Sequence, residues 1–397
     1  MADKNILYLI NHAGAGGTER YVLDLAESYP FGKIFFIYNE PGLLLEKMAR
    51  FISGSARIAM RKPWDLSAAK KIAAFCIDNA IDLIHTQFMR ETYIALTAKK
   101  FLKNKRAIKI VCTWHLNDSH NVLWRAVNRF LSGGAERYIA VCETLKATMI
   151  KNKLPEGKII VVFNGVVPSR EPDGAYEMRA VFRKKEGIAG NAFVFTTLTR
   201  FTPEKGTLFL LKSIQKLKET ADRPFVVLVA GDGPMAAELK QAAAEYGVDG
   251  LVRFLGYRTD AADILLASDA FLNTSESECL SYAILEAMDH SLPIIATAVG
   301  GNVDIVNDTT KCGVTVAYGD TDGLAAAMNN YLNDDAAAKA AGKRAKEAVE
   351  TKFNAGRFKA ETYGIYADVL NDTKVKSTQS KKIKKANECA EDFNVSR

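Results

Sequence analysis

Short apolar runs, rich in β-branched and aromatic residues, alternate with longer segments of helical periodicity along most of the chain. In residues 16–29, Tyr21, Val22, Leu25 and Ala26 recur at the spacing of one helix face. The first series of strand-like runs comprises residues 5–10, 33–38, 81–86, 108–114, 137–142 and 158–165. Strand-like runs that alternate with helical segments predict a parallel sheet covered by helices.

A polar stretch at 167–177, VPSREPDGAYE, interrupts the alternation with two prolines and a glycine. A second series of strand-like runs follows it, at residues 192–200, 225–231, 252–257, 270–275, 293–298 and 313–318. The sequence therefore predicts an α/β protein of two doubly wound, Rossmann-like domains. Because such sheets bind ligands at the carboxyl ends of their strands, the two domains are expected to face a deep cleft.

These patterns divide the chain into four parts. We expect an N-terminal domain over residues 1–172 and a C-terminal domain over residues 173–352. Residues 353–371 are expected to form a C-terminal helix that packs back on the N-terminal domain. Residues 372–397 are lysine-rich and poor in apolar side chains, which predicts a disordered basic tail.

The composition is that of a soluble globular protein, with 48% hydrophobic and 25% charged residues among 397. No apolar run approaches the roughly 18 residues of a membrane span, and the N-terminus lacks the features of a signal peptide. The six cysteines follow no regular spacing, which indicates reduced thiols. We expect a cytoplasmic protein without a disulfide framework.

The formal charge of +7 is concentrated in the N-terminal half. A cationic tract without acidic residues from 92 to 117 contains Lys99, Lys100, Lys103, Lys105, Arg106 and Lys109. No aromatic residues alternate with these cations, so single-stranded nucleic acid is not an expected partner. The tract is either a solvated helix end and loop or a surface for anionic membranes, on the inner face of which the protein would be peripheral.

A glycine-rich loop follows the first strand-like run, in NHAGAGGTERYV at 11–22. Gly14, Gly16 and Glu19 give G-x-G-x-x-E, so the third glycine of a dinucleotide fingerprint is missing. Glu40 lies where a ribose-binding acid would be sought, which keeps a dehydrogenase as an alternative. The Gly16–Gly17 pair indicates that a ligand or the opposite domain approaches the backbone here.

Two cations mark the start of the second domain, in TLTRFTPEKG at 197–206. Arg200 follows a strand-like run and Lys205 precedes a helical segment, so both side chains can reach one crevice. A planar guanidinium and a compact ammonium group suit a diphosphate. Two solvated loop cations are the alternative. The later turn VAGDGP lacks the Lys-Ser/Thr pair of an ATP-binding loop.

Two carboxylates stand eight positions apart in NTSESECLSYAILEAM, residues 273–288. A helix starting near Ser281 would place Glu278 before its N-terminus and Glu286 about one turn inside. The free N–H groups and positive end of this helix suit a diphosphate. A nucleotide sugar carries hydroxyls on both sides of its diphosphate, so the two carboxylates can bind its two ends. Two surface acids on one helix are the alternative.

Two candidate metal sites are rejected. Asp320 and Asp322 precede a helical segment, where one of them is expected to be an N-cap. Cys112 and His115 lie an odd number of positions apart on a strand-like run and point to opposite faces, so they cannot form a zinc site with His120. We expect no bound metal and no cofactor.

In this order, the motifs resemble the retaining GT-B glycosyltransferases of family 4, the glycosyl transferases group 1. The residues at 276–306 are similar to its signature with the E-x7-E pair, and LTRFTPEKG is similar to its phosphate-binding loop. VAGDGP and VRFLGY follow in the family's order, and GGTERYV, VCTWH, YIAVCETL and FNGV match its N-terminal half. Ser291 and the tripeptide at 279–281 depart from the usual residues, which affects donor choice more than reaction type.

The resemblance implies a GT-B fold whose N-terminal domain binds the acceptor and whose C-terminal domain binds a nucleotide sugar. It assigns the departing diphosphate to Arg200 and Lys205, the sugar hydroxyls to Glu278 and the ribose to Glu286. His115 would hydrogen-bond the transferred sugar, and the catalytic set is Glu278, His115, Arg200 and Lys205. The remaining donor-binding positions are Gly16, Gly17, Leu280, Ser281 and Tyr282.

The implied reaction is transfer of a hexose-type sugar from a UDP-linked donor to a hydroxyl acceptor, with retention. The acceptor would be lipid-linked or a glycan, in cell-surface polysaccharide or glycolipid biosynthesis. One alternative is a UDP-sugar 2-epimerase of GT-B architecture, which would act without an acceptor. Another is an inactive nucleotide-sugar-binding partner, which would bind the donor without turnover.

Overall fold

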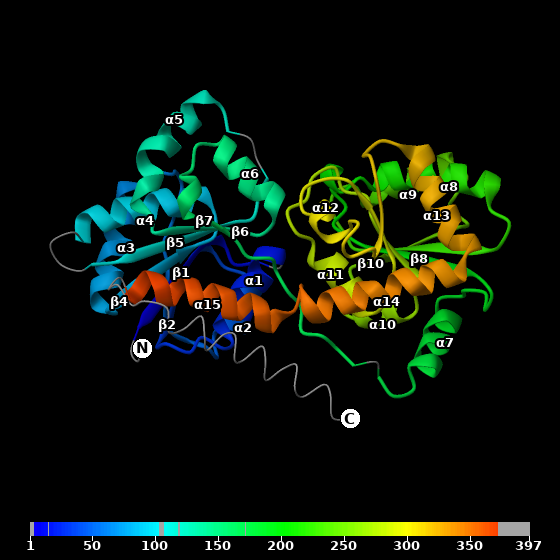
Figure 1. The fold of residues 1–397 in the computed structure, drawn as a ribbon, viewed down its shortest axis with the longest axis horizontal. Coiled ribbons are helices and arrows are strands. Elements are labelled where there is room, and N and C mark those ends of the chain that lie inside the picture. Colours follow the sequence, from blue (N-terminus) through cyan, green and yellow to red (C-terminus); the bar gives the residue numbers. More distant parts are fainter. Residues whose placement is uncertain (1–3, 15, 103–106, 118–119, 171, 372–397) are drawn as a thin grey trace.

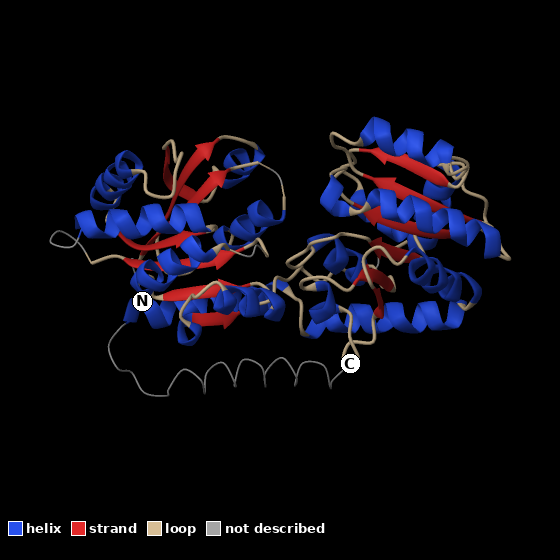
Figure 2. Ribbon diagram, turned by 90° about the horizontal axis from the view of Figure 1, so that it is seen from above, coloured by secondary structure: helices blue, strands red, loops and turns tan. Residues whose placement is uncertain are grey.

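A computed structural model describes residues 4–14, 16–102, 107–117, 120–170 and 172–371. Two α/β domains lie side by side, each with a parallel sheet that carries helices on both faces (Figures 1 and 2). The predicted fold class is confirmed. The proposed tail, 372–397, lies outside the described residues.

The N-terminal sheet has seven strands in the order β3-β2-β1-β4-β5-β6-β7. Its strands β1 to β4 are Asn5–His12, Ile34–Glu40, Ile52–Arg57 and Ile81–Thr86, followed by β5, β6 and β7 at Lys109–Trp114, Arg137–Ala140 and Ile159–Val161. Its helices are α1 (Gly17–Ala26), α2 (Leu43–Met48), α3 (Leu66–Asp78), α4 (Met89–Leu102), α5 (Val122–Leu131) and α6 (Glu143–Lys151), with short 3-10 turns η1 (Ser132–Gly134) and η2 (Glu156–Lys158). The order reverses between β1 and β4, so the loops after these strands diverge and leave a crevice.

The C-terminal sheet has six strands in the order β10-β9-β8-β11-β12-β13. They are β8 (Phe193–Leu198), β9 (Phe225–Ala230), β10 (Val252–Gly256), β11 (Ala270–Asn273), β12 (Ile294–Thr297) and β13 (Gly313–Val316). Its helices are α7 (Ala175–Lys185), α8 (Thr207–Thr220), α9 (Ala236–Glu245), α10 (Ala261–Leu266), α11 (Tyr282–Asp289), α12 (Asn302–Ile305), α13 (Thr321–Asn333) and α14 (Asp335–Thr351), with a 3-10 turn η3 (Pro203–Lys205). Here the order reverses between β8 and β11.

The apolar runs form the cores that the pattern predicts. All six residues of β9 and all four of β12 are buried, as expected of strands covered on both faces. The N-caps follow the predicted chemistry, because Ser281 accepts from the Ile284 N–H and Asp320 accepts from the Gly323 N–H. No disulfide joins the described cysteines, and Cys389 lies outside the described residues.

The chain crosses between the domains twice, and the two crossings run side by side. The Val166 N–H donates to the Phe353 carbonyl at 2.9 Å, and the Ala355 N–H returns a bond to the Val166 carbonyl at 2.8 Å. The last helix, α15 (Ala355–Asn371), then packs on the N-terminal domain (Figure 1). Its Tyr366 hydroxyl lies 2.5 Å from His85 Nδ1, which joins the end of the chain to the N-terminal core.

None of the helices within the described ranges has both the length and the apolar character needed to cross a bilayer.

Candidate active site

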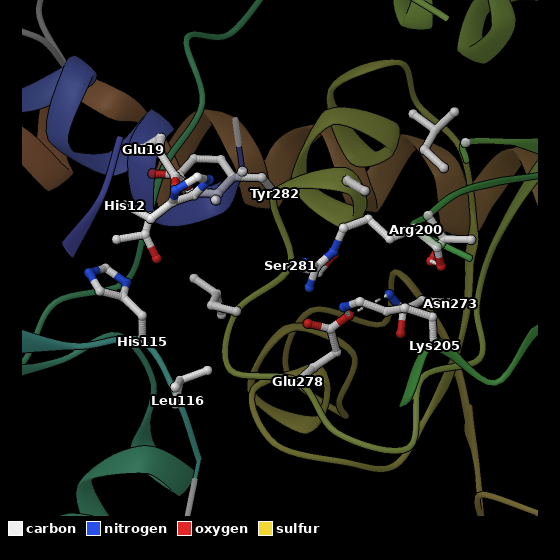
Figure 3. A pocket seen from close by; sticks show the side chains of 18 of the residues that line it. His12, Glu19, His115, Leu116, Arg200, Lys205, Asn273, Glu278, Ser281 and Tyr282 are labelled. Atoms are coloured by element: carbon white, nitrogen blue, oxygen red, sulfur yellow. Dashed lines mark hydrogen bonds and ion pairs between the residues drawn. The ribbon is translucent and has the colours of Figure 1, made fainter. Parts of the chain in front are cut away.

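A cleft of about 1070 Å³ lies between the two domains. One wall comes from the carboxyl ends of β1, β4 and β5, and the other from those of β8 and β11. The crevice between β1 and β4 and that between β8 and β11, where the strand order reverses, both open into the cleft. The structure brings the predicted site residues to this cleft, as Figure 3 shows for several of them. They are Gly16, Gly17, His115, Arg200, Lys205, Glu278, Leu280, Ser281, Tyr282 and Glu286.

Lys205 and Glu278 form the central ion pair of the cleft. Lys205 Nζ lies 2.6 Å from Glu278 Oε1, and both side chains are mostly buried, at 17% and 12% exposure. Oε1 also accepts from the Ser275 hydroxyl at 2.9 Å and from the Asn273 side-chain amide at 3.5 Å. The Glu278 side chain is therefore held by several contacts rather than left solvated, which argues against its interpretation as a plain surface acid.

Two glycines fix the backbone around this pair. Gly206 follows Lys205 with φ of +65°, and a Cβ there would lie 2.0 Å from the Thr274 carbonyl oxygen. Gly300 has φ of +49°, and a Cβ there would lie 1.7 Å from the Glu278 carbonyl oxygen. Only glycine fits both the dihedral angles and the close approach. The loops after β8 and β11 are thus held at fixed positions.

The first turns of α1 and α11 meet across the cleft. An ideal Cβ on Gly17 would touch the Tyr282 ring at 3.5 Å, so the opposite domain makes the close approach predicted for the Gly16–Gly17 pair. The first N–H groups of a helix have no partners within it and form its positive end. Two such ends, one from each domain, favour an anion between them.

Arg200 lies at the solvent side of the same region. Its side chain is 72% exposed, and its Nη2 lies 3.7 Å from a Glu204 carboxylate oxygen. Figure 3 shows Arg200, Lys205 and Glu278 pointing into one part of the cleft. An exposed guanidinium beside a buried ammonium group gives two cations at different depths, which suits the two phosphates of a diphosphate.

Glu286 faces the N-terminal domain. One of its carboxylate oxygens lies 4.0 Å from Nη1 of Arg20 on α1, and Arg20 itself is held by Asp24 at 2.8 Å. Burial raises the pKa of the Glu286 carboxyl, and the nearby Arg20 opposes this shift. Sequence reasoning missed Arg20, because a charged residue in a helix carries no signal for a contact with another domain.

His115 lies on the opposite wall from Glu278 (Figure 3). It follows β5, is half-buried, and its Nε2 lies 3.0 Å from the Gln87 side-chain oxygen. Burial lowers the pKa of its imidazole to about 3, so the ring is neutral at neutral pH. It can hydrogen-bond a sugar without adding charge.

Glu91 is a further carboxylate of the cleft, and sequence reasoning missed it. It lies in the first turn of α4, lines the cleft and is 1% exposed. Its Oε2 has no hydrogen-bond partner among the described residues, and burial raises the pKa of its carboxyl to about 7. Its sequence context, an acid in the first turn of a helix, gave no indication of this burial.

Contacts within the protein engage the acids of the rejected Asp320–Asp322 metal site and of the dehydrogenase alternative. Asp320 is the N-cap of α13, and Asp322 pairs with Lys216 at 2.5 Å. Glu40, the ribose-binding acid of the dehydrogenase alternative, lies 3.2 Å from His12 Nδ1. Over the described residues, no group of three or more His, Cys, Asp and Glu side chains is placed to hold a metal ion.

Similarity to known proteins indicates the class of enzyme to which the chain belongs. The family model described as Glycosyltransferase Family 4 matches residues 15–170, and that described as Glycosyl transferases group 1 matches residues 178–348. The crystal structure of Anabaena Alr3699/HepE in complex with UDP superposes with a TM-score of 0.79 at 19% identity, over 92% of this chain and 100% of that one. Fold and matches together identify the chain as a GT-B glycosyltransferase.

Two relatives whose names state a substrate are distantly similar to this chain. The N-acetyl-alpha-D-glucosaminyl L-malate synthase of Bacillus anthracis is 28% identical over 320 residues, 79% of this chain and 81% of that protein. The UDP-Gal:alpha-D-GlcNAc-diphosphoundecaprenol alpha-1,3-galactosyltransferase of Escherichia coli is 28% identical over 186 residues, 46% of this chain and 48% of that protein. Both are glycosyltransferases, which favours transfer over epimerisation.

Proposed function

We propose that this glycosyltransferase moves a hexose-type sugar from a UDP-linked donor to a hydroxyl acceptor, with retention, in cell-surface polysaccharide or glycolipid biosynthesis. The observation that carries the proposal is the Lys205–Glu278 pair, 2.6 Å apart beside the N-terminus of α11. It brings a cation for a leaving diphosphate and a carboxylate for sugar hydroxyls to one point. The UDP named for the Anabaena structure and the UDP-Gal named for the E. coli relative support the choice of nucleotide.

The donor would lie along the loop from β11 into α11. Its diphosphate would accept hydrogen bonds from the N–H groups of residues 280–282 and from Arg200 and Lys205. The two cations would neutralise the negative charge that develops on the diphosphate as the sugar departs. Glu278 would accept from the sugar hydroxyls and Glu286 from the ribose diol. Gly16 and Gly17 would let the backbone of the opposite domain approach the donor.

Retention would follow from attack on the face that the diphosphate leaves. The bond between the anomeric carbon and the phosphate oxygen breaks, the acceptor oxygen bonds to that carbon, and its proton passes to the departing diphosphate. Glu278 is engaged by Lys205 and Ser275, so it is poorly suited to be a nucleophile. His115 would hydrogen-bond the transferred sugar from the other wall.

The acceptor side would be the N-terminal wall of the cleft. The undecaprenol-linked acceptor in the name of the E. coli relative supports a lipid-linked hydroxyl, and the cationic tract from Lys99 to Lys109 supports an anionic membrane beside it. We place the protein on the cytoplasmic face of the membrane, as a peripheral protein.

A panel of nucleotide sugars tests the proposed donor. The free energy of unfolding should rise by about 2.7 kcal/mol with a UDP-hexose at 100 times its dissociation constant, and much less with GDP-linked or ADP-linked sugars. Release of UDP that requires an acceptor supports transfer. Conversion of UDP-N-acetylglucosamine alone would favour the epimerase, and binding without any turnover would favour the inactive partner.

Activity is expected to be unchanged by EDTA, because Arg200, Lys205 and the two helix N-termini supply the positive charge that a divalent ion supplies elsewhere. Initial rates with and without the chelator check this expectation. A loss of turnover in EDTA that manganese restores would contradict it and would direct attention back to Asp320 and Asp322.

A further inference from the structure

Helix α6 of the N-terminal domain and helix α12 of the C-terminal domain meet across the domain boundary (Figure 1). The carboxylate of Asp304, on α12, accepts from the Glu143 N–H at 3.0 Å and from the Thr144 N–H at 3.4 Å. These are the first two N–H groups of α6, which have no partner within their own helix. The N-cap residue Cys142 accepts from the Leu145 N–H, so Asp304 serves the two N–H groups before it. One domain therefore caps a helix of the other, with a negative charge at the positive helix end.

A further hydrogen bond ties α6 to the loop that precedes α12. The Thr144 hydroxyl donates to the Gly300 carbonyl at 3.0 Å. Gly301, next in this loop, packs on the start of α6, since a Cβ there would lie 3.1 Å from the Cys142 Cβ. The hydrogen bonds that join Glu143 and Thr144 to Gly300 and Asp304 are called here the α6–α12 contact.

The same loop holds the backbone at Glu278. A Cβ on Gly300 would lie 1.7 Å from the Glu278 carbonyl oxygen, and one on Gly301 would lie 1.8 Å from the Cys279 carbonyl oxygen. Segments packed this closely cannot shift independently, because a dense interior leaves no free space between them. Since Thr144 bonds to Gly300, the position of α6 bears directly on the backbone that carries Glu278.

Side chains also connect α12 with the Glu278 carboxylate. Asn302, the first residue of α12, is buried, and its amide donates to Asn273 Oδ1 at 3.0 Å and to the Thr297 carbonyl at 3.1 Å. The Asn273 amide in turn donates to Glu278 Oε1 at 3.5 Å. The helix that caps α6 is therefore joined to the carboxylate that pairs with Lys205.

We infer that Thr144 and Asp304 are positioning residues for the transfer reaction, because the α6–α12 contact fixes Glu278 in place when the two domains face each other. Neither residue is among those that line the cleft, so both act through Glu278. The inference rests on the role proposed above for Glu278 at the sugar.

The contact makes activation of the donor depend on the opposite domain. The diphosphate and ribose would lie on the C-terminal domain alone, so free UDP can bind without the α6–α12 contact. The carboxylate for the sugar is held correctly only when α6 is in place, and α6 belongs to the domain that would bind the acceptor. Closure of the domains therefore completes the site, which limits reaction of the donor before the acceptor wall is present.

Two substitutions remove parts of the contact. Thr144→Val keeps the side-chain shape but loses the hydrogen bond to Gly300, and Asp304→Ala uncaps α6. Each should lower kcat by about tenfold, as expected when a reacting group is displaced, while calorimetry gives the wild-type affinity for UDP. Turnover is measured as UDP released from the UDP-hexose that the donor panel selects, with water as the acceptor. The matched control is Asp308→Ala, an exposed acid shortly after α12, which should leave both quantities unchanged.

A double-mutant cycle separates positioning of Glu278 from a general effect on the fold. In the Glu278→Ala background, Thr144→Val should lower kcat no further, because the group that it positions is gone. Additive losses would overturn the inference, and so would wild-type kcat in both Thr144→Val and Asp304→Ala. Full kcat in Glu278→Ala itself would contradict the proposed role of Glu278, and the inference with it.

Hydrogen exchange gives a readout that does not depend on turnover. The backbone N–H groups of residues 275–282 should exchange faster in Thr144→Val and in Asp304→Ala than in the wild type, because loss of the contact loosens the loop that holds them. The Asp308→Ala control should exchange at the wild-type rate. Unchanged exchange in both contact variants would overturn the inference.

Discussion

Replacing Glu278 with alanine is expected to lower kcat by about 100-fold or more, because the proposed contact with the sugar strengthens as that sugar changes shape and charge in the transition state. The affinity for UDP should be unchanged or higher. Glu278 holds Lys205 at 2.6 Å in the structure, and its removal leaves the ammonium group free for the diphosphate. Initial rates at saturating donor, with calorimetry on UDP, measure both effects.

A matched substitution separates charge from shape at this position. Glu278→Gln keeps the side-chain volume and can still accept from Ser275, which donates to Glu278 Oε1 at 2.9 Å. It should also lose most of the activity, since the negative charge is what the developing positive charge on the sugar requires. A glutamine variant with nearly full kcat would contradict this role.

Replacing Lys205 with alanine is expected to weaken UDP binding by about tenfold to a hundredfold, the range for a lost hydrogen bond to a charged group. The kcat should fall further, because the charge on the leaving diphosphate grows in the transition state. The substitution also leaves Glu278, which is 12% exposed, without its cation. Calorimetry and initial rates report the two effects separately.

Lys212→Ala is the control for this variant, since Lys212 lies on the exposed side of α8, the helix that follows Lys205. It should bind UDP as the wild type does. If Lys205→Ala retains both UDP affinity and kcat, the ammonium group does not meet the diphosphate, and Arg200 with the helix N-termini must carry the charge.

The sequence was sufficient for the fold because each strand and helix carries its own periodic signal. Short, mainly apolar runs such as β9 and β12 are buried on both faces, as is typical of strands in the interior of a parallel sheet. Once the strands are placed, their carboxyl ends are placed too. That is why residues after β8 and β11, among them Arg200 and Glu278, were expected in one crevice.

Contacts between side chains of separate loops and helices could not be predicted in this way. The family resemblance assigns Lys205 to the phosphates and Glu278 to the sugar, but the direct ion pair depends on how the loops after β8 and β11 are held by Gly206 and Gly300. Arg20 reaches Glu286 only because α1 and α11 meet at the cleft. Such contacts follow from packing, which local periodicity does not encode.

The central claim is that, of the two carboxylates of the E-x7-E pair, Glu278 binds the transferred sugar and Glu286 binds the ribose. One comparison tests this claim most directly. UDP is titrated into the Glu278→Ala and Glu286→Ala variants by calorimetry, with donor KM and kcat measured alongside. Glu286→Ala should weaken UDP and raise the KM with little change in kcat, because the ribose does not react. Glu278→Ala should bind UDP normally and lose kcat. Weakened UDP binding in Glu278→Ala, with normal binding in Glu286→Ala, would mean that the donor lies the other way round and that the assignment is wrong.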